Sequence, residues 1–164
     1  MSSRLILIRG TGDVASAVAH LLFMQGHRVL CHDISGPAYS RRGMAFVDAV
    51  FEGAATLDGV LARRVVNLEA VAHMLGCRKA VAVTTAEFQI VLDTIGPSVG
   101  IDARMRKRAK PEKLLGLAPL TIGLGPNFIA GETVDIAIET AWSDALGELV
   151  ERGPTRALAG EPRA

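Results

Sequence analysis

Two glycines and a carboxylate near the start of the chain have the types and spacing of a nucleotide-binding loop. Gly10 and Gly12 follow an apolar run, Ala15 completes a Gly-x-Gly-x-x-Ala pattern, and Asp33 lies 21 residues after Gly12. In dinucleotide sites the glycines permit a tight turn and close approach to a pyrophosphate, the helix N-terminus attracts the anion, and the acid holds a ribose. The predicted cofactor contacts are Gly10, Thr11, Gly12, Asp13, Val14 and Asp33.

Asp13 leaves two interpretations of this loop open. A carboxylate beside the phosphate position would repel a pyrophosphate, yet aspartate is also a favoured helix N-cap. As an N-cap, Asp13 would bond the N–H groups that a phosphate would otherwise use. The loop is then either a nucleotide site or only a tight turn between a strand and a helix.

Two arginines beyond the second predicted strand are further candidates for cofactor binding. Arg41 and Arg42 lie in a turn-rich loop after Asp33. Paired guanidinium groups can hold a phosphate or carboxylate bidentately, and an arginine at this place can accept a 2′-phosphate. The alternative is that both arginines are solvated loop charges.

Two later loops could border the same ligand. Asp102 ends an apolar strand and precedes Arg104, while Gly125 and Asn127 form a second glycine turn after a predicted strand at 120–124. Ligands of open α/β sheets bind outside the carboxyl ends of the strands, so these four residues are predicted to contact the cofactor. A simple turn between strands is the alternative for Gly125 and Asn127. A solvated basic face is the alternative for Asp102 and Arg104, and it is the favoured interpretation of Arg106, Lys110 and Lys113.

Residue patterns for known catalytic and metal sites are missing from the sequence. There is no Gly-x-Ser-x-Gly, no Cys–His signature, no Gly-Lys-Ser/Thr phosphate loop and no His-x-x-x-His. Cys31 and Cys77 lie far apart in apolar stretches, which is typical of reduced thiols in the cytoplasm. No catalytic residue and no metal site is therefore predicted.

The elements that must position these residues alternate between strands and helices. Continuous apolar runs at 5–8, 28–32, 80–84 and 98–101 indicate buried parallel strands. Helices are predicted at 14–25, 68–75 (ended by Gly76) and 86–95, and Asp58-Gly59 predicts a hairpin. The predicted fold is α/β: a Rossmann-like open, mostly parallel sheet with helices on both faces and antiparallel strands near the C-terminus.

Length and composition narrow the class of protein further. The chain has 164 residues, 49% of them hydrophobic, with a formal net charge of +1. One domain over 1–153 is predicted, with a disordered tail at 154–164. The balanced charge disfavours nucleic-acid binding, and no apolar run approaches the roughly 18 residues of a membrane span. The mean hydropathy of +0.31 favours a homo-oligomer.

Three segments occur in a fixed order along the chain: Ile8-Arg9-Gly10-Thr11-Gly12-Asp13-Val14-Ala15, the run from Arg41-Arg42-Gly43 to Phe51-Glu52-Gly53, and Ile122-Gly123-Leu124-Gly125-Pro126-Asn127-Phe128. Together they resemble the selenium-dependent molybdenum hydroxylase system protein family. That family is loosely similar to the accessory proteins of xanthine dehydrogenase. The chain departs from the family after Thr140, where an Arg-Gly-His run is replaced by Ala141-Trp142-Ser143, and at Asn127, where glycine is common.

The resemblance implies a cytoplasmic accessory protein that helps to mature a molybdenum hydroxylase client enzyme. The implied ligand is a nucleotide-bearing cofactor: the molybdenum cofactor in its dinucleotide form, or NAD(P). Two alternatives stay open at this point. One is a small NAD(P)-dependent oxidoreductase, and the other is a non-catalytic interaction protein that keeps only the fold.

Overall fold

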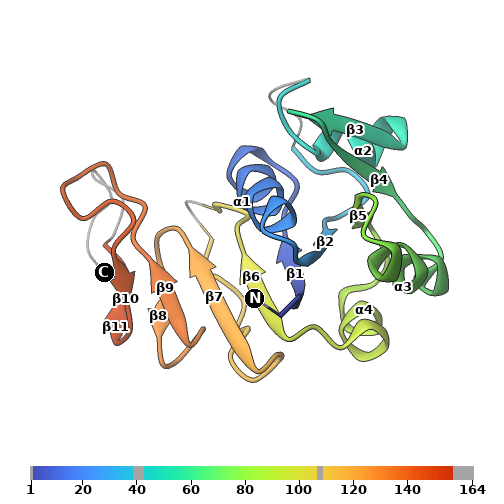
Figure 1. Cartoon of the computed structure of the whole chain (residues 1–164). Helices are drawn as coiled ribbons and strands as arrows, with labels where there is room; N and C mark the ends of the chain where they lie inside the picture. The colour runs from blue at the N-terminus through green and yellow to red at the C-terminus, as the bar shows by residue number, and fades with distance from the viewer. Residues whose placement is uncertain (1, 39–42, 107–108, 157–164) are drawn as a thin grey trace.

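The computed structural model describes residues 2–38, 43–106 and 109–156. Helices and strands alternate through these ranges as the apolar runs predict (Figure 1). The helices are α1 (Asp13–Met24), α2 (Val47–Glu52), α3 (Leu68–Cys77) and α4 (Phe88–Ile95). The strands are β1 (Leu5–Arg9), β2 (Arg28–His32), β3 (Ala54–Leu57), β4 (Val60–Arg64), β5 (Val81–Thr84), β6 (Val99–Asp102), β7 (Leu120–Leu124), β8 (Ile129–Ala130), β9 (Ile136–Ile138), β10 (Leu149–Val150) and β11 (Gly153–Pro154).

The described strands form one large sheet and one small one. The large sheet has the order β10-β9-β7-β6-β1-β2-β5-β4-β3. Its central ladders, from β9 to β4, are parallel, whereas β3–β4 and β9–β10 are antiparallel. Strands β8 and β11 form a separate antiparallel pair. The predicted Rossmann-like open sheet is thus confirmed, including the antiparallel strands near the C-terminus and the hairpin at Asp58-Gly59.

Helices cover both faces of the central strands, which explains why these strands are apolar throughout. Successive side chains of a strand point to opposite faces. In β1, Ile6 and Ile8 pack into a core with residues of α1 and α2, while Leu7 packs into a second core with residues of α3 and α4. A strand buried on both faces has no polar side to show, and the pattern becomes continuous instead of alternating.

The strand order reverses between β1 and β6. From β1 the chain passes to its neighbour β2, continues to β3 at the edge of the sheet and returns inward through β4 and β5. It then crosses to the other side of β1 with β6. The loops that leave β1 and β6 therefore begin next to each other, at the carboxyl ends of these two strands. In open α/β sheets such a switch point is where ligands bind.

Three details differ from the sequence prediction. Gly76 lies inside α3, and the helix ends one residue later because Arg78 takes a left-handed conformation (φ 48°). The two-residue strands β8 and β11 were not predicted. The predicted tail at 154–164 begins too early, because Pro154 pairs with Ile129 and Thr155 is 6% exposed. Residues 157–164 lie outside the described residues.

Candidate functional site

The loop after β1 has the geometry that its glycines predict. Gly10 has φ +115°, and its N–H donates to the carbonyl of His32 at 2.8 Å. A Cβ at Gly10 would lie 3.2 Å from the Cβ of Ala15 and 3.3 Å from the Cα of Arg104. The position therefore requires glycine on two grounds, conformation and space. Ala15, fully buried, is the small residue that lets α1 pack against this turn.

The start of α1 corrects one interpretation of Asp13. Gly12, which has no side chain, is the N-cap, and Asp13 is the first helical residue. The first intrahelical bond runs from the N–H of Ser16 to the carbonyl of Gly12 at 2.8 Å. The Asp13 carboxylate is thus not the N-cap, because the cap position belongs to its neighbour. In the first turn the helix offers no carbonyl to the N–H groups of Val14 and Ala15.

Gly12 leaves the approach to this helix end open. A Cβ built on Gly12 meets no atom within 4 Å among the described residues, and the backbone there is extended. Val14 is half-buried and packs its side chain against the core, so its contribution to the loop is its main chain. The arrangement can present main-chain N–H groups and the positive end of the helix dipole to an anion.

Thr11 and Asp33 join the loop to the end of β2. The Thr11 hydroxyl, fully buried, donates to Asp33 Oδ2 at 2.6 Å, and Asp33 Oδ1 accepts the N–H of Ile34 at 2.9 Å. The predicted acid therefore lies beside the glycine loop. Each carboxylate oxygen has a further lone pair, so a half-buried Asp33 can still accept hydroxyl groups of a ribose.

Asp102 and Arg104 form a bidentate pair at the end of β6. Arg104 Nη2 lies 2.5 Å from Asp102 Oδ2, and Arg104 Nε lies 3.0 Å from Asp102 Oδ1. Asp102 is 3% exposed, and its Cα pairs with that of Arg9 in the β1–β6 ladder. Both predicted residues thus lie at the switch point, where the backbone of Arg104 packs against Gly10.

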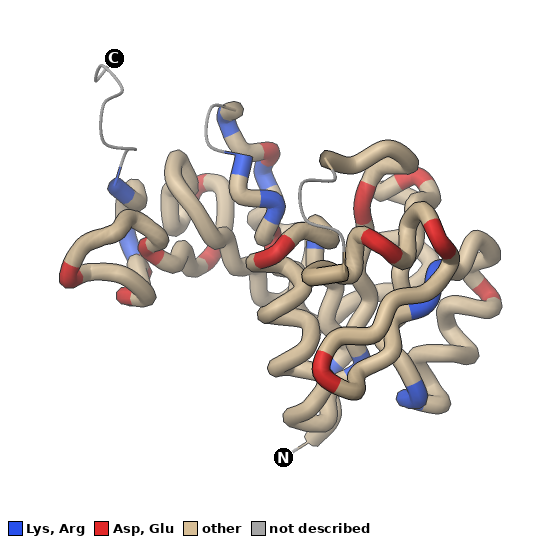
Figure 2. The backbone as a smooth tube through the Cα atoms, turned by 90° about the horizontal axis from the view of Figure 1, so that it is seen from above, with Lys and Arg blue, Asp and Glu red and all other residues tan. Residues whose placement is uncertain are grey.

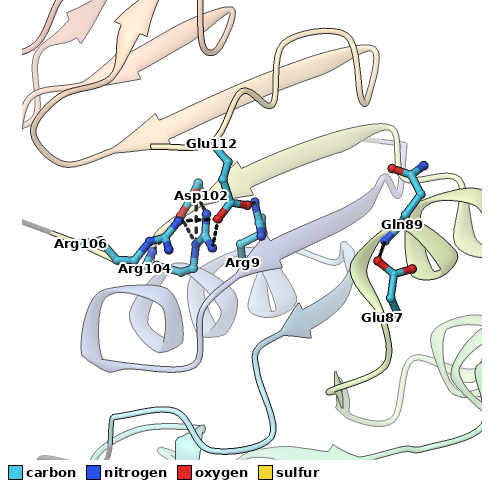
Figure 3. Close-up of polar contacts among 7 residues, drawn as sticks. All are labelled: Arg9, Glu87, Gln89, Asp102, Arg104, Arg106 and Glu112. Atoms are coloured by element: carbon cyan, nitrogen blue, oxygen red, sulfur yellow. Dashed lines mark hydrogen bonds and ion pairs between the residues drawn. The ribbon is translucent and has the colours of Figure 1, made fainter. Parts of the chain in front are cut away.

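Glu112 gathers three arginines at the same place (Figure 3). Its carboxylate lies 2.6 Å from Arg9 Nη1, 2.7 Å from Arg106 Nη2 and 3.3 Å from Arg104 Nη1. We call Arg9, Arg104, Arg106, Asp102 and Glu112 the arginine cluster. Its three guanidinium groups face two carboxylates, which leaves one positive charge in excess. Figure 2 shows Lys and Arg positions gathered along the segment that follows β6.

Burial and charge act on this cluster in opposite directions. Burial lowers the pKa of Arg9, and the nearby Arg104 lowers it further. Burial also opposes the charge of Arg104, but hydrogen bonds and charge from Asp102 outweigh it and raise the pKa. Partial burial raises the pKa of Glu112, yet hydrogen bonds from Arg106 and Arg9 lower it overall to about 2. All of these groups are charged at neutral pH.

The remaining predicted contacts divide into two groups. Gly125 (φ +122°) lies behind Met105, whose Sδ would be 3.3 Å from a Cβ there, and Asn127 (φ 71°) occupies the turn. The Gly125–Asn127 turn flanks Met105 and thus borders the arginine cluster from the side of β7. Arg41 and Arg42 lie outside the described residues.

The described residues offer weaker candidates for catalysis and for metal binding than for binding an anion. His32 Nε2 lies 2.9 Å from the carbonyl of Ala86, and burial lowers the pKa of its ring. The neutral imidazole is thus engaged by backbone. Within 2–38, 43–106 and 109–156, no three His, Cys, Asp or Glu residues gather in a way that could hold a metal ion. None of the helices in those ranges is long and apolar enough to cross a bilayer.

Local sequence reasoning missed Arg9 and Glu112 and interpreted Arg106 as a solvated charge. Arg9 had one usable signal: a charged residue ends an apolar strand immediately before a glycine turn. Its guanidinium lies 3.9 Å from the centroid of the Phe88 ring, at the start of α4. Glu112 carries no such signal, because its partners lie up to 103 positions away.

The site belongs to a Rossmann-like open α/β fold, and comparison with known proteins adds one relative. YqeB of Escherichia coli (strain K12), described as an uncharacterized protein, is 35% identical over 159 residues. The match covers 97% of this chain and 29% of YqeB, so the chain spans less than a third of that protein's length. No family model matches the chain, and no solved structure matches it.

Proposed function

We propose that this protein binds a nucleotide-bearing cofactor at the switch point between β1 and β6. The observation that carries the proposal is the start of α1 beside Gly10, where the N-cap is Gly12 and a Cβ on Gly12 would meet no described atom within 4 Å. A pyrophosphate would meet main-chain N–H groups of α1, and Asp33 would accept the hydroxyl groups of a ribose. Arg104, whose backbone lies against Gly10, supplies a cation beside the loop.

NAD(P) and the dinucleotide form of the molybdenum cofactor share the pyrophosphate and ribose that these residues fit. The resemblance of the glycine segments to molybdenum hydroxylase system proteins supports the second ligand. We therefore propose a cytoplasmic accessory role, in which the protein holds the cofactor for a molybdenum hydroxylase client. The engaged, neutral His32 supports a binding role over an NAD(P)-dependent oxidoreductase.

Nucleotide binding is tested by thermal shift with ADP, NAD and NADP on the wild type and on Gly12→Glu. A ligand at 100 times its Kd should stabilise the wild type by about 2.7 kcal/mol. Gly12→Glu adds bulk and negative charge where the phosphate would lie, so we expect the shift to disappear while the protein stays folded.

Gly76→Glu is the matched control. It adds the same side chain within α3, at another glycine where a Cβ meets nothing within 4 Å. We expect this variant to keep the wild-type shift. No shift with any of the three nucleotides would rule out the proposed function, and an unchanged shift in Gly12→Glu would place the ligand elsewhere.

A further inference from the structure

Glu112 is held in the way that a bound anion would be held. Its carboxylate accepts hydrogen bonds from three guanidinium groups that come from two places in the chain, Arg9 at the end of β1 and Arg104 and Arg106 after β6. The side chain of Glu112 is nevertheless 52% exposed, so solvent can receive it if it leaves. By contrast, Asp102 is buried beneath Arg104 and is a fixed part of the cluster.

Arg9 retains hydrogen-bonding capacity that none of the described residues uses. The residue is only 7% exposed, and its buried Nε has no hydrogen-bond partner among the described residues. A buried guanidinium N–H without an acceptor is costly. The Phe88 ring covers one face of the Arg9 guanidinium, with its centroid 3.9 Å from Cζ, and this contact holds the guanidinium in place. A carboxylate has two oxygen atoms, whereas a phosphoryl group offers three and more charge.

Two small hollows are lined in part by residues of this cluster. One is lined by Arg9 together with Phe88, Leu114 and Thr121. The other is lined by Asp102 and Arg106 together with Met105 and Pro126. Each hollow has a volume of only about 10 Å³, so a phosphoryl group would occupy the exposed place of Glu112 and not either hollow.

We propose that Arg9, Arg104 and Arg106 form a phosphoryl-binding site, in which Glu112 occupies the place of the ligand until a phosphoryl group displaces it. The crevice then has two anion-binding elements, the N-terminus of α1 and the arginines. This proposal rests on the nucleotide site only for the source of the phosphoryl group, which can be a nucleotide or inorganic pyrophosphate.

The test is calorimetric titration of the full chain with inorganic pyrophosphate and with ADP. Glu112→Gln removes the competing charge, so we expect its Kd for pyrophosphate to fall roughly tenfold below that of the wild type. Glu132→Gln is the matched control, because it removes the same charge from an exposed position in the turn between β8 and β9. Adding Arg106→Gln to Glu112→Gln should reverse the gain. Circular dichroism checks that each variant is folded.

The outcomes separate this proposal from the nucleotide site. Glu112→Gln that binds pyrophosphate no more tightly than Glu132→Gln would overturn it and make Glu112 a permanent counter-ion, even where ADP binding depends on Gly12. Tighter pyrophosphate binding in Glu112→Gln supports it, even where no nucleotide shifts the melting temperature. A larger gain for ADP than for pyrophosphate identifies a nucleotide as the source.

Discussion

Thr11 shows how one side chain fixes the relation between the glycine loop and β2. It is fully buried, its hydroxyl donates to Asp33, and its carbonyl accepts the hydroxyl of Ser16 at 2.9 Å. Ser16 Oγ in turn accepts the N–H of Phe46 at 2.8 Å. The loop is therefore held by a chain of buried hydrogen bonds before any ligand arrives, and its geometry is set in advance.

Thr11→Val should lower the free energy of unfolding by about 2 kcal/mol, because it removes a buried hydrogen bond to a charged group at nearly constant volume. Thr56→Val makes the same change on the exposed side of β3 and should stay within about 0.5 kcal/mol of the wild type. Urea unfolding measures both. Equal values for the two variants would mean that the Thr11–Asp33 bond contributes little.

Glu112 should make stability depend on acid pH. Its folded pKa of about 2 lies below the ordinary 4.5, so its stabilisation is complete above pH 4.5 and is lost as the pH falls from 4.5 toward 2. Glu112→Gln lacks this contribution at every pH. The difference in urea midpoint between wild type and Glu112→Gln should therefore be larger at pH 6 than at pH 3.

Other acids titrate in both proteins, so their contributions cancel in this comparison. Glu87 and Glu139, whose pKa values are also lowered, are the main examples. Glu112 is half exposed, and solvent screening keeps the difference small. A difference that is independent of pH would show that the arginines do not hold Glu112 in solution.

Among the elements, the turn between β7 and β8 depends on one close approach. A Cβ at Gly123 would overlap the ring of Phe128, which is 5% exposed in a small core with Leu114 and Val134. The backbone of β7 thus lies directly against an aromatic ring, and the Gly125–Asn127 turn closes over it. Glycine is required at position 123 for space and not for backbone conformation.

Gly123→Ala should lower the free energy of unfolding by about 1–3 kcal/mol, because the methyl group overpacks this core. Gly76→Ala inside α3 should instead raise it by roughly 0.5–1 kcal/mol, since alanine favours a helix and its Cβ meets nothing there. Thermal unfolding of the two variants measures whether each one is less or more stable than the wild type. A neutral Gly123→Ala would mean that Phe128 can move aside.

The elements were more predictable than the site. Apolar runs such as 28–32 and 120–124 became strands with the predicted bounds, because burial on both faces leaves a local signature in the sequence. Strands β8 and β11 contain two residues each, too few to show a hydrophobic period in the sequence. Gly76 was read as a helix end, yet helix packing tolerates it and Arg78 supplies the left-handed cap instead.

The placement of the candidate site residues at the switch point was predictable where the motif is local, and not where the cluster is assembled by the fold. Gly10, Gly12 and Asp33 follow from spacing within one strand–helix–strand unit, and Asp102 and Arg104 follow from their position at a strand end. Glu112 reaches Arg9 only because β1 and β6 are neighbours in the sheet. That adjacency comes from the strand order, which local patterns do not encode.

For the whole molecule, the strand order divides the sheet into two contiguous blocks of sequence. Strands β1 to β5 lie on one side, strands β6, β7, β9 and β10 lie on the other, and the β1–β6 ladder is the seam between them. A ligand in the crevice would touch Gly12 from one block and Arg104 from the other, and would thus act as a clamp across the seam. With ADP bound, amide hydrogen exchange should slow in β1 and β6 and stay unchanged in the distant β3–β4 hairpin. Uniform slowing across the sheet would show global stabilisation without such a clamp.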